Sequence, residues 1–176
     1  MSRALSLNAR AQQDAAYADD LPAVLIEITH PELVTPIRLS SDNADLISQS
    51  AEAQIRGTRS SWRGADPATE PFLFLPMGLE MPSDESDRPA AMRIVFDLFD
   101  ASLPALLRSV ADRATANVAV VMASTPDLVE QAWLGLEMVG AGFGSQVSIE
   151  MSREAIEEEG APMHIVGKHR FPGLYR

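Results

Sequence analysis

The chain has 176 residues, of which 25 are acidic and 14 basic, so its formal net charge is −11. Apolar residues make up 46% of the chain, which is typical of a globular protein and not of a disordered one. The acidic surplus argues against a surface that grips nucleic acid or an anionic membrane, because both require clustered positive charge. The absence of cysteine excludes disulfides, thiolate metal sites and cysteine nucleophiles.

The length predicts a single domain over residues 1–176. Residues 1–20 contain no apolar segment of the kind that a secretory signal requires. The longest apolar runs, such as 118–123, are far shorter than the ~20 residues that span a bilayer. We therefore expect a soluble protein that folds in a cytoplasm.

The first part of the chain predicts a helix, a hairpin and a long loop. Residues 6–17 are rich in Ala and Gln and favour a short, weakly docked helix. Residues 23–29 (AVLIEIT) and 36–40 (PIRLS) are rich in strand-forming residues and are joined by a short link that contains proline, which indicates a hairpin. Residues 41–70 are polar, and we expect a long loop there that is either mobile or completed by another subunit.

The middle of the chain predicts two strands and a helix. Residues 71–81 restart the strand pattern, with a bend or sheet edge at Pro76. Residues 92–99 alternate, so that three side chains are expected to face inward: Ile94, Phe96 and Leu98. Residues 102–110 show the clearest helical spacing, with one apolar stripe after a capping serine: Leu103, Leu106, Leu107 and Val110.

The last part predicts further strands and a basic tail. Residues 117–123 favour a buried strand, and 125–127 favour a short helical turn because proline follows threonine there. Residues 133–142 and 146–151 predict a hairpin, and 153–159 one more helical turn. Taken together, the chain is mainly β: an antiparallel β-sandwich or split β-barrel with one flanking helix and a short N-terminal helix.

No motif for catalysis, metal binding or cofactor binding is present. His164 and His169 lack the spacing and the partner ligands of a metal site, and are expected to be solvated tail residues. The acidic cluster at 84–87 lacks the ligand order of a calcium loop. Asp97 and Asp100 are interpreted as a solvent-facing residue and a helix start, not as an acid–base pair. We expect no enzyme, no metal and no cofactor.

Five segments of the chain carry a resemblance. They are SRALSLNARAQ, VLIEITHPELVTPIRLSSD, PFLFLPMGLEMPSDESDRPAAMRI, ASTPDLVEQAWLGLEM and the closing RFPGLY. In this order they resemble a family of minor tail proteins of tailed bacteriophages and prophages, long described as a phage domain of unknown function. That family is similar to distal tail and tail-tip proteins.

The resemblance implies a structural protein of the virion, assembled in the bacterial host cytoplasm. Such proteins form a ring, generally of six copies, between the tail tube and the hub, with a domain of the tail-tube fold. The implied partners are copies of the chain itself, the tail tube protein and the hub proteins, with DNA only passing through the lumen. An acidic lumen repels that DNA and keeps it from sticking.

A ring of repeated contacts needs arms that reach neighbouring subunits. The loop at 41–70, the weak N-terminal helix and the C-terminal arm at 161–176 are the candidates. Their expected anchors are one residue of the loop and four of the arm: Trp62, Arg170, Phe171, Leu174 and Tyr175. The alternative is that these side chains pack on their own domain.

Two other classes of function stay open. The first is a small β-barrel module that binds a sugar or a peptide, which requires a cavity lined by aromatic side chains. The chain has only 2 Trp and 2 Tyr for that purpose. The second is a tail-associated hydrolase, for which only carboxylates such as Asp97 and Asp100 are available.

Overall fold

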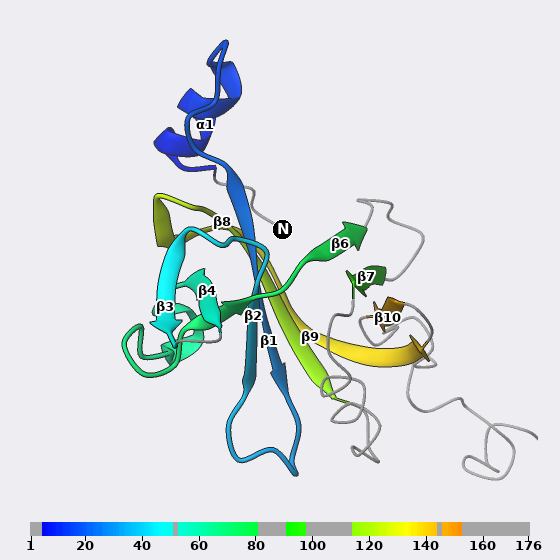
Figure 1. The fold of residues 1–176 in the computed structure, drawn as a ribbon. Helices are drawn as coiled ribbons and strands as arrows, with labels where there is room; N and C mark the ends of the chain where they lie inside the picture. The colour runs from blue at the N-terminus through cyan, green and yellow to red at the C-terminus, as the bar shows by residue number, and fades with distance from the viewer. Residues whose placement is uncertain (1–4, 51–52, 81–90, 98–113, 144–145, 153–176) are drawn as a thin grey trace, which may run out of the picture.

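The computed structural model describes residues 5–50, 53–80, 91–97, 114–143 and 146–152. Within these ranges the chain forms one α-helix and a single sheet of ten strands (Figure 1). The prediction of a mainly β fold with a short N-terminal helix is therefore confirmed. The helix predicted at 102–110 and the turn predicted at 153–159 lie outside the described residues.

The N-terminal helix α1 spans Leu7–Asp14. It begins at Ser6, whose Oγ accepts a hydrogen bond from the backbone N–H of Ala9 at 3.0 Å, as a capping serine does. Ala9 is the residue of α1 that is fully buried, whereas Leu7 is exposed. The weak docking that the sequence predicts for this helix follows from its thin apolar stripe.

The ten strands form one sheet with a single parallel pair. Their bounds are β1 Pro22–Thr29, β2 Ile37–Ser40, β3 Asp45–Gln49, β4 Gln54–Thr58, β5 Phe72–Phe74, β6 Met77–Glu80, β7 Ala91–Asp97, β8 Thr115–Met122, β9 Thr125–Phe143 and β10 Gln146–Ser152. Their order across the sheet is β3-β4-β5-β2-β1-β8-β9-β10-β7-β6. β2 and β5 run parallel, and every other neighbouring pair is antiparallel.

β1 lies in the middle of the sheet, between β2 and β8. It pairs with β2 in the predicted hairpin and with β8 along its whole length, from Pro22 opposite Met122 to Thr29 opposite Thr115. Six consecutive residues of β1, 23–28, are buried, because neighbours cover both faces of this strand. The predicted strand at 117–123 corresponds to β8.

β9 connects the two halves of the sheet. Its first part pairs with β8 and its last part with β10, and Figure 1 shows the strand curving between them. Gly135 lies in the part of β9 that pairs with β8, where the register shifts between Ala116 and Val118, and its φ of 66° is a conformation that glycine adopts without strain. The hairpin predicted from 133–142 and 146–151 is confirmed. The helical turn predicted at 125–127 is wrong, because Met122 pairs directly with Thr125 and β9 begins there.

The loop predicted at 41–70 is also wrong in part. It contains β3 and β4, which form a hairpin at one end of the sheet, and the short 3₁₀ helix η1 (Trp62–Gly64). Four of the five residues of β3 are exposed, so the segment lacks the apolar alternation that identifies a half-buried strand.

The strand predicted at 71–81 is two strands in different places. β5 pairs with β2 and β4, whereas β6 pairs with β7 at the opposite end of the sheet. The chain leaves the sheet between them at Leu75 and Pro76, where the sequence places a bend.

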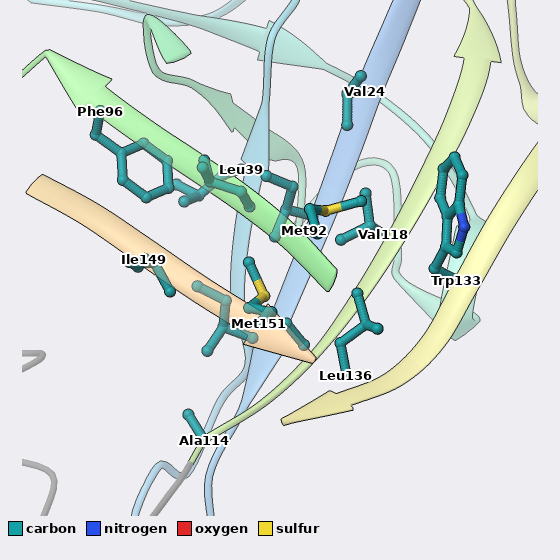
Figure 2. Packing of buried hydrophobic residues seen from close by; sticks show 14 residues of the cluster. Val24, Leu39, Met92, Phe96, Ala114, Val118, Trp133, Leu136, Ile149 and Met151 are labelled. Atoms are coloured by element: carbon teal, nitrogen blue, oxygen red, sulfur yellow. The ribbon is translucent and has the colours of Figure 1, made fainter. Parts of the chain in front are cut away.

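The two halves of the sheet pack face to face over one large core (Figure 2). Val24, Ile26 and Ile28 of β1 share this core with Ile94 and Phe96 of β7, although three strands separate β1 from β7 in the sheet. The sheet must therefore fold over on itself, with β9 at the bend. The inward orientation predicted for Ile94 and Phe96 is confirmed, and Leu98 lies outside the described residues. A smaller core on the other face of β1 contains Leu25, Phe72 and Val121.

Candidate functional site

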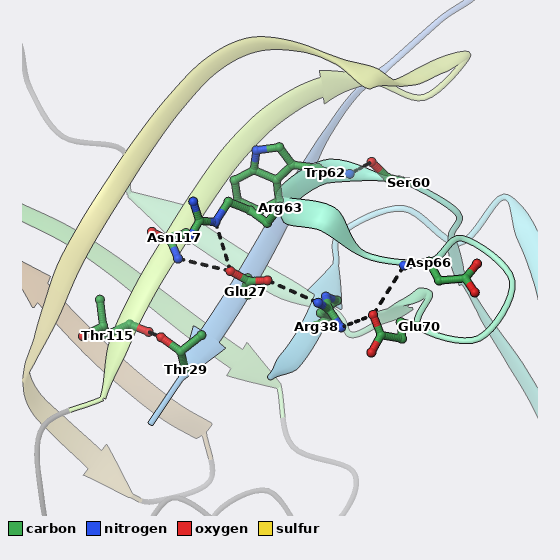
Figure 3. A network of polar contacts seen from close by, with 10 residues as sticks. All are labelled: Glu27, Thr29, Arg38, Ser60, Trp62, Arg63, Asp66, Glu70, Thr115 and Asn117. Atoms are coloured by element: carbon green, nitrogen blue, oxygen red, sulfur yellow. Dashed lines mark hydrogen bonds and ion pairs between the residues drawn. The ribbon is translucent and has the colours of Figure 1, made fainter. Parts of the chain in front are cut away.

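A buried carboxylate lies in the middle of β1. Glu27 interrupts the apolar run 23–28 and is only 3% exposed. Its Oε2 is 3.4 Å from Nη2 of Arg38, which lies directly opposite on β2. Its Oε1 is 3.2 Å from Nε of Arg63 and accepts a hydrogen bond from Nδ2 of Asn117 at 3.2 Å (Figure 3). Both carboxylate oxygens therefore have cationic or N–H partners.

The contacts continue outward from Glu27 on both sides. Arg38 also contacts Glu70, whose Oε2 is 3.2 Å from Nη1. Asn117 accepts a hydrogen bond from the backbone N–H of Gly135 at 3.0 Å. This network connects β1, β2, β8 and β9 with the segment that follows β4. A buried ion pair adds little net stability, but it penalises any strand register that would separate its charges.

Arg63 has unusual backbone geometry at this network. Its φ of 60° places a non-glycine residue in the left-handed region, which costs about 1–2 kcal/mol. Its side chain is 44% exposed and reaches Glu27 from the surface. The contact with Glu27 helps to hold Arg63 in this conformation.

The turn that carries Trp62 is fastened to the tip of the β8–β9 hairpin. Oδ1 of Asp127 accepts hydrogen bonds from the backbone N–H of Ser61 at 2.6 Å and from its hydroxyl at 2.9 Å. Ser60 donates its hydroxyl to the carbonyl of Pro126 at 2.8 Å. The backbone N–H of Ser61, followed by its hydroxyl, lowers the pKa of the Asp127 carboxyl below its ordinary value. The turn is therefore attached by charge-assisted hydrogen bonds.

Trp62 packs on its own chain. Its ring is half-buried and lies 6.0 Å from the ring of Phe72, centroid to centroid, at the edge of the smaller core. Its role as an anchor on a neighbouring subunit stays a prediction. The four other predicted anchors, Arg170, Phe171, Leu174 and Tyr175, lie outside the described residues.

The residues considered for chemistry are not brought together. Asp97 ends β7, while Asp100, His164, His169 and the acidic cluster at 84–87 lie outside the described residues. His30 is buried after β1, and its Nδ1 accepts a hydrogen bond from the backbone N–H of Glu32 at 3.1 Å. No group of three or more potential metal ligands occurs in the part of the chain that the structure describes. In the same part, no helix is long and apolar enough to cross a membrane.

The ends of the sheet are the surfaces most suited to assembly. Among the described residues, β3 and β6 each pair with a neighbour on one side only. β3 and β4 also present exposed apolar side chains, Leu46 and Ile55. The link of the β1–β2 hairpin carries Val34, which is 99% exposed. An unpaired strand edge is a template for pairing with another chain.

No protein-family model and no curated protein sequence matches the chain. The resemblance to phage tail proteins therefore stays a prediction.

Two buried acidic residues were not among the predicted site residues: Glu27, and Glu130 of β9, which is only 8% exposed. Glu27 gave a signal, since a carboxylate in a run of apolar strand residues needs a buried partner. Glu130 has no such signal, because the apolar residues around it do not alternate clearly enough to show that its side chain is buried.

Proposed function

We propose that the chain is a structural subunit of the tail tip of a tailed bacteriophage, without catalytic activity. It forms a ring that links the tail tube to the hub and lines the channel through which DNA leaves. The observation that carries this proposal is the sheet with two unlike open edges, β3 and β6, in the described residues. Contacts between two different surfaces of identical copies are heterologous, and they close into a ring when the rotation permits.

Three further features support the proposal. The mainly β fold belongs to the same class as the ring domains of the tail proteins that the sequence resembles. The exposed apolar residues on β3 and β4 offer contact area beside one edge. The net charge of −11 suits a channel wall that DNA must pass without binding. Fold class alone does not identify a function, so the assignment to phage tails in particular depends on the resemblance of the five sequence segments.

The test is the copy number of the assembled protein. Native mass spectrometry and electron microscopy of the chain, alone and co-expressed with tube and hub proteins, should show a ring, with six copies expected from the resemblance. Purified tails should contain the chain. A protein that stays monomeric with these partners and is absent from tails would refute the proposal.

Edge variants make the test specific. Gly78→Lys on β6 places a charge on an open edge, and the added Cβ lies 4.0 Å from its nearest neighbour, so the fold tolerates it. Ser48→Lys does the same on β3, where the residue is exposed. Ala15→Lys, at the end of α1, is the matched control. Both edge variants should reduce ring formation, and the control should not.

A further inference from the structure

A small pocket lies between α1 and the sheet. Its volume is about 220 Å³, room for about seven water molecules at roughly 30 Å³ each. Its walls come from segments far apart in the sequence: Leu5, Ala9 and Gln12 of the N-terminal segment, and Val120 and Met122 of β8. Most of the lining is apolar, and a pocket of this kind binds the stem of a ligand by burying it.

Glu130 supplies an unpaired charge to this pocket. The side chain lines the pocket, and the residue is only 8% exposed. Its Oε2 accepts a hydrogen bond from the backbone N–H of Ser6 at 2.7 Å. Its Oε1 is buried and has no hydrogen-bond partner within the described residues. A buried carboxylate oxygen without a partner is costly, so a donor beside it would be strongly favoured.

The backbone explains why a carboxylate lies here. Val120 pairs with Gln131 and Val121 with Val129, so Glu130 is the extra residue of a β-bulge in β9. A bulge redirects one side chain out of the regular alternation, and bulges are over-represented beside functional sites. The sheet thus places Glu130 under α1 by a local irregularity.

The charge of the pocket favours a positively charged ligand. Two carboxylates, Asp20 and Glu130, lie among the described lining residues, and none of those residues is basic. Asp20 is engaged by Ser124 and Asn8, so Glu130 keeps the free acceptor. We propose that this pocket binds a guanidinium or primary ammonium group on a short apolar stem. The stem packs against Val120 and Met122, and the cationic head donates to Glu130.

This chemistry has two sources, an arginine or lysine side chain of a second chain and a free alkylamine. The proposal does not depend on the proposed function, since a ring subunit without this pocket would still form a ring. The experiments below test two separate statements: the pocket prefers a cation to a neutral ligand, and Glu130 causes this preference.

The first experiment titrates the full chain with N-ethylguanidinium and with N-ethylurea, its neutral analogue of similar shape. Binding is followed by calorimetry and by the backbone amide signals of Ser6 and Ala9. We expect ethylguanidinium to bind with a dissociation constant of about 1 mM or less, and ethylurea at least about tenfold more weakly. Equal binding of the two probes, or binding of neither, overturns the proposal. This comparison uses the wild-type chain and so does not require any variant to fold.

The second experiment removes the charge. Glu130→Gln keeps the shape of the side chain and should weaken ethylguanidinium binding at least about tenfold. Asp45→Asn, on the exposed edge strand β3, removes one negative charge away from the pocket and should leave binding unchanged. Unchanged binding in Glu130→Gln, or an equal loss in Asp45→Asn, overturns the assignment to Glu130.

Sedimentation velocity separates the two sources. If the ligand is an arginine or lysine of a second chain, Glu130→Gln weakens association, and ethylguanidinium competes with it. If the ligand is a free amine, the probe binds and association does not change. Both outcomes support the site, because both require a cation at Glu130.

Discussion

Removing the carboxylate of Glu27 is the sharpest test of the buried charge network. In Glu27→Ala, Arg38 loses the partner 3.4 Å away while its side chain stays about nine-tenths buried, because it is only 9% exposed. Glu70 remains beside Arg38 but is 39% exposed, so it compensates the buried guanidinium only in part. Asn117 also loses a hydrogen-bond acceptor. Arg63 is 44% exposed and its guanidinium can be hydrated by water, so the loss of its contact with Glu27 costs little.

The expected loss of stability follows from the burial of Arg38. Leaving one member of a buried ion pair unpaired costs about 3–5 kcal/mol. For a domain of this size, each kcal/mol lowers the melting temperature by about 2–4 °C, which gives a fall of about 6–20 °C. Urea denaturation followed by tryptophan fluorescence and circular dichroism measures the free energy of unfolding directly. Glu32→Ala, in the exposed link of the β1–β2 hairpin, is the control and should change it by less than about 0.5 kcal/mol.

A double variant tests the reasoning from the other side. Glu27→Leu together with Arg38→Met removes both charges and fills the space with apolar groups. Replacing a buried pair in this way is often neutral or stabilising, so the double variant should recover most of the stability lost in Glu27→Ala. A loss below about 1 kcal/mol in Glu27→Ala would show that water or another group compensates Arg38, and the account of the network would be wrong.

Two further predictions concern the turn at Ser61 and the packing of β4. The hydrogen bonds from Ser61 lower the pKa of Asp127 below 3.8, so their stabilisation is present above that pH and lost as pH falls through the lowered value. Asp127→Asn should therefore reduce the fall in urea midpoint between about pH 5 and pH 2, and an unchanged pH profile would contradict this. Gly57→Ala should cost about 1–3 kcal/mol, because its Cβ would lie 2.0 Å from the carbonyl oxygen of Phe72. Gly78→Ala is the control, since its Cβ meets nothing closer than 4.0 Å; equal midpoints in urea would refute the steric argument.

The alternating segments were predictable from the sequence because burial on one face leaves a period of two. β7 and β10 carry that pattern, whereas β1 and β8 are nearly continuous apolar runs that were predictable because both of their faces are buried. β3 and β4 were missed because they form an exposed hairpin at the end of the sheet, where polar side chains are tolerated on both faces. At 125–127, the threonine and proline that favour a helix start instead begin a strand after a tight turn, since pairing with β8 overrides the local preference.

The candidate sites were less predictable than the fold. Because side chains alternate along a strand, the sequence shows that Glu27 faces away from Ile26 and Ile28. Its pairing with Arg38 depends on the register of the β1–β2 hairpin, which a link of seven residues leaves undetermined. Glu130 depends on a bulge, and a single extra residue in a strand of nineteen has no sequence signature. Trp62 lies in a segment without apolar alternation, so its contact with Phe72 has no sequence signal.

The pairing of β1 with β8 has a consequence for how the chain is made. Thr29 and Thr115 are 86 positions apart, so β1 is synthesised long before its second partner exists. At about 5–20 residues per second, a ribosome takes roughly 4–17 s to cover that distance. During this interval one edge of an apolar strand has no partner strand, and nascent chains aggregate at such segments. Chaperones that shield the emerging N-terminal half should therefore govern how much native protein a cell obtains.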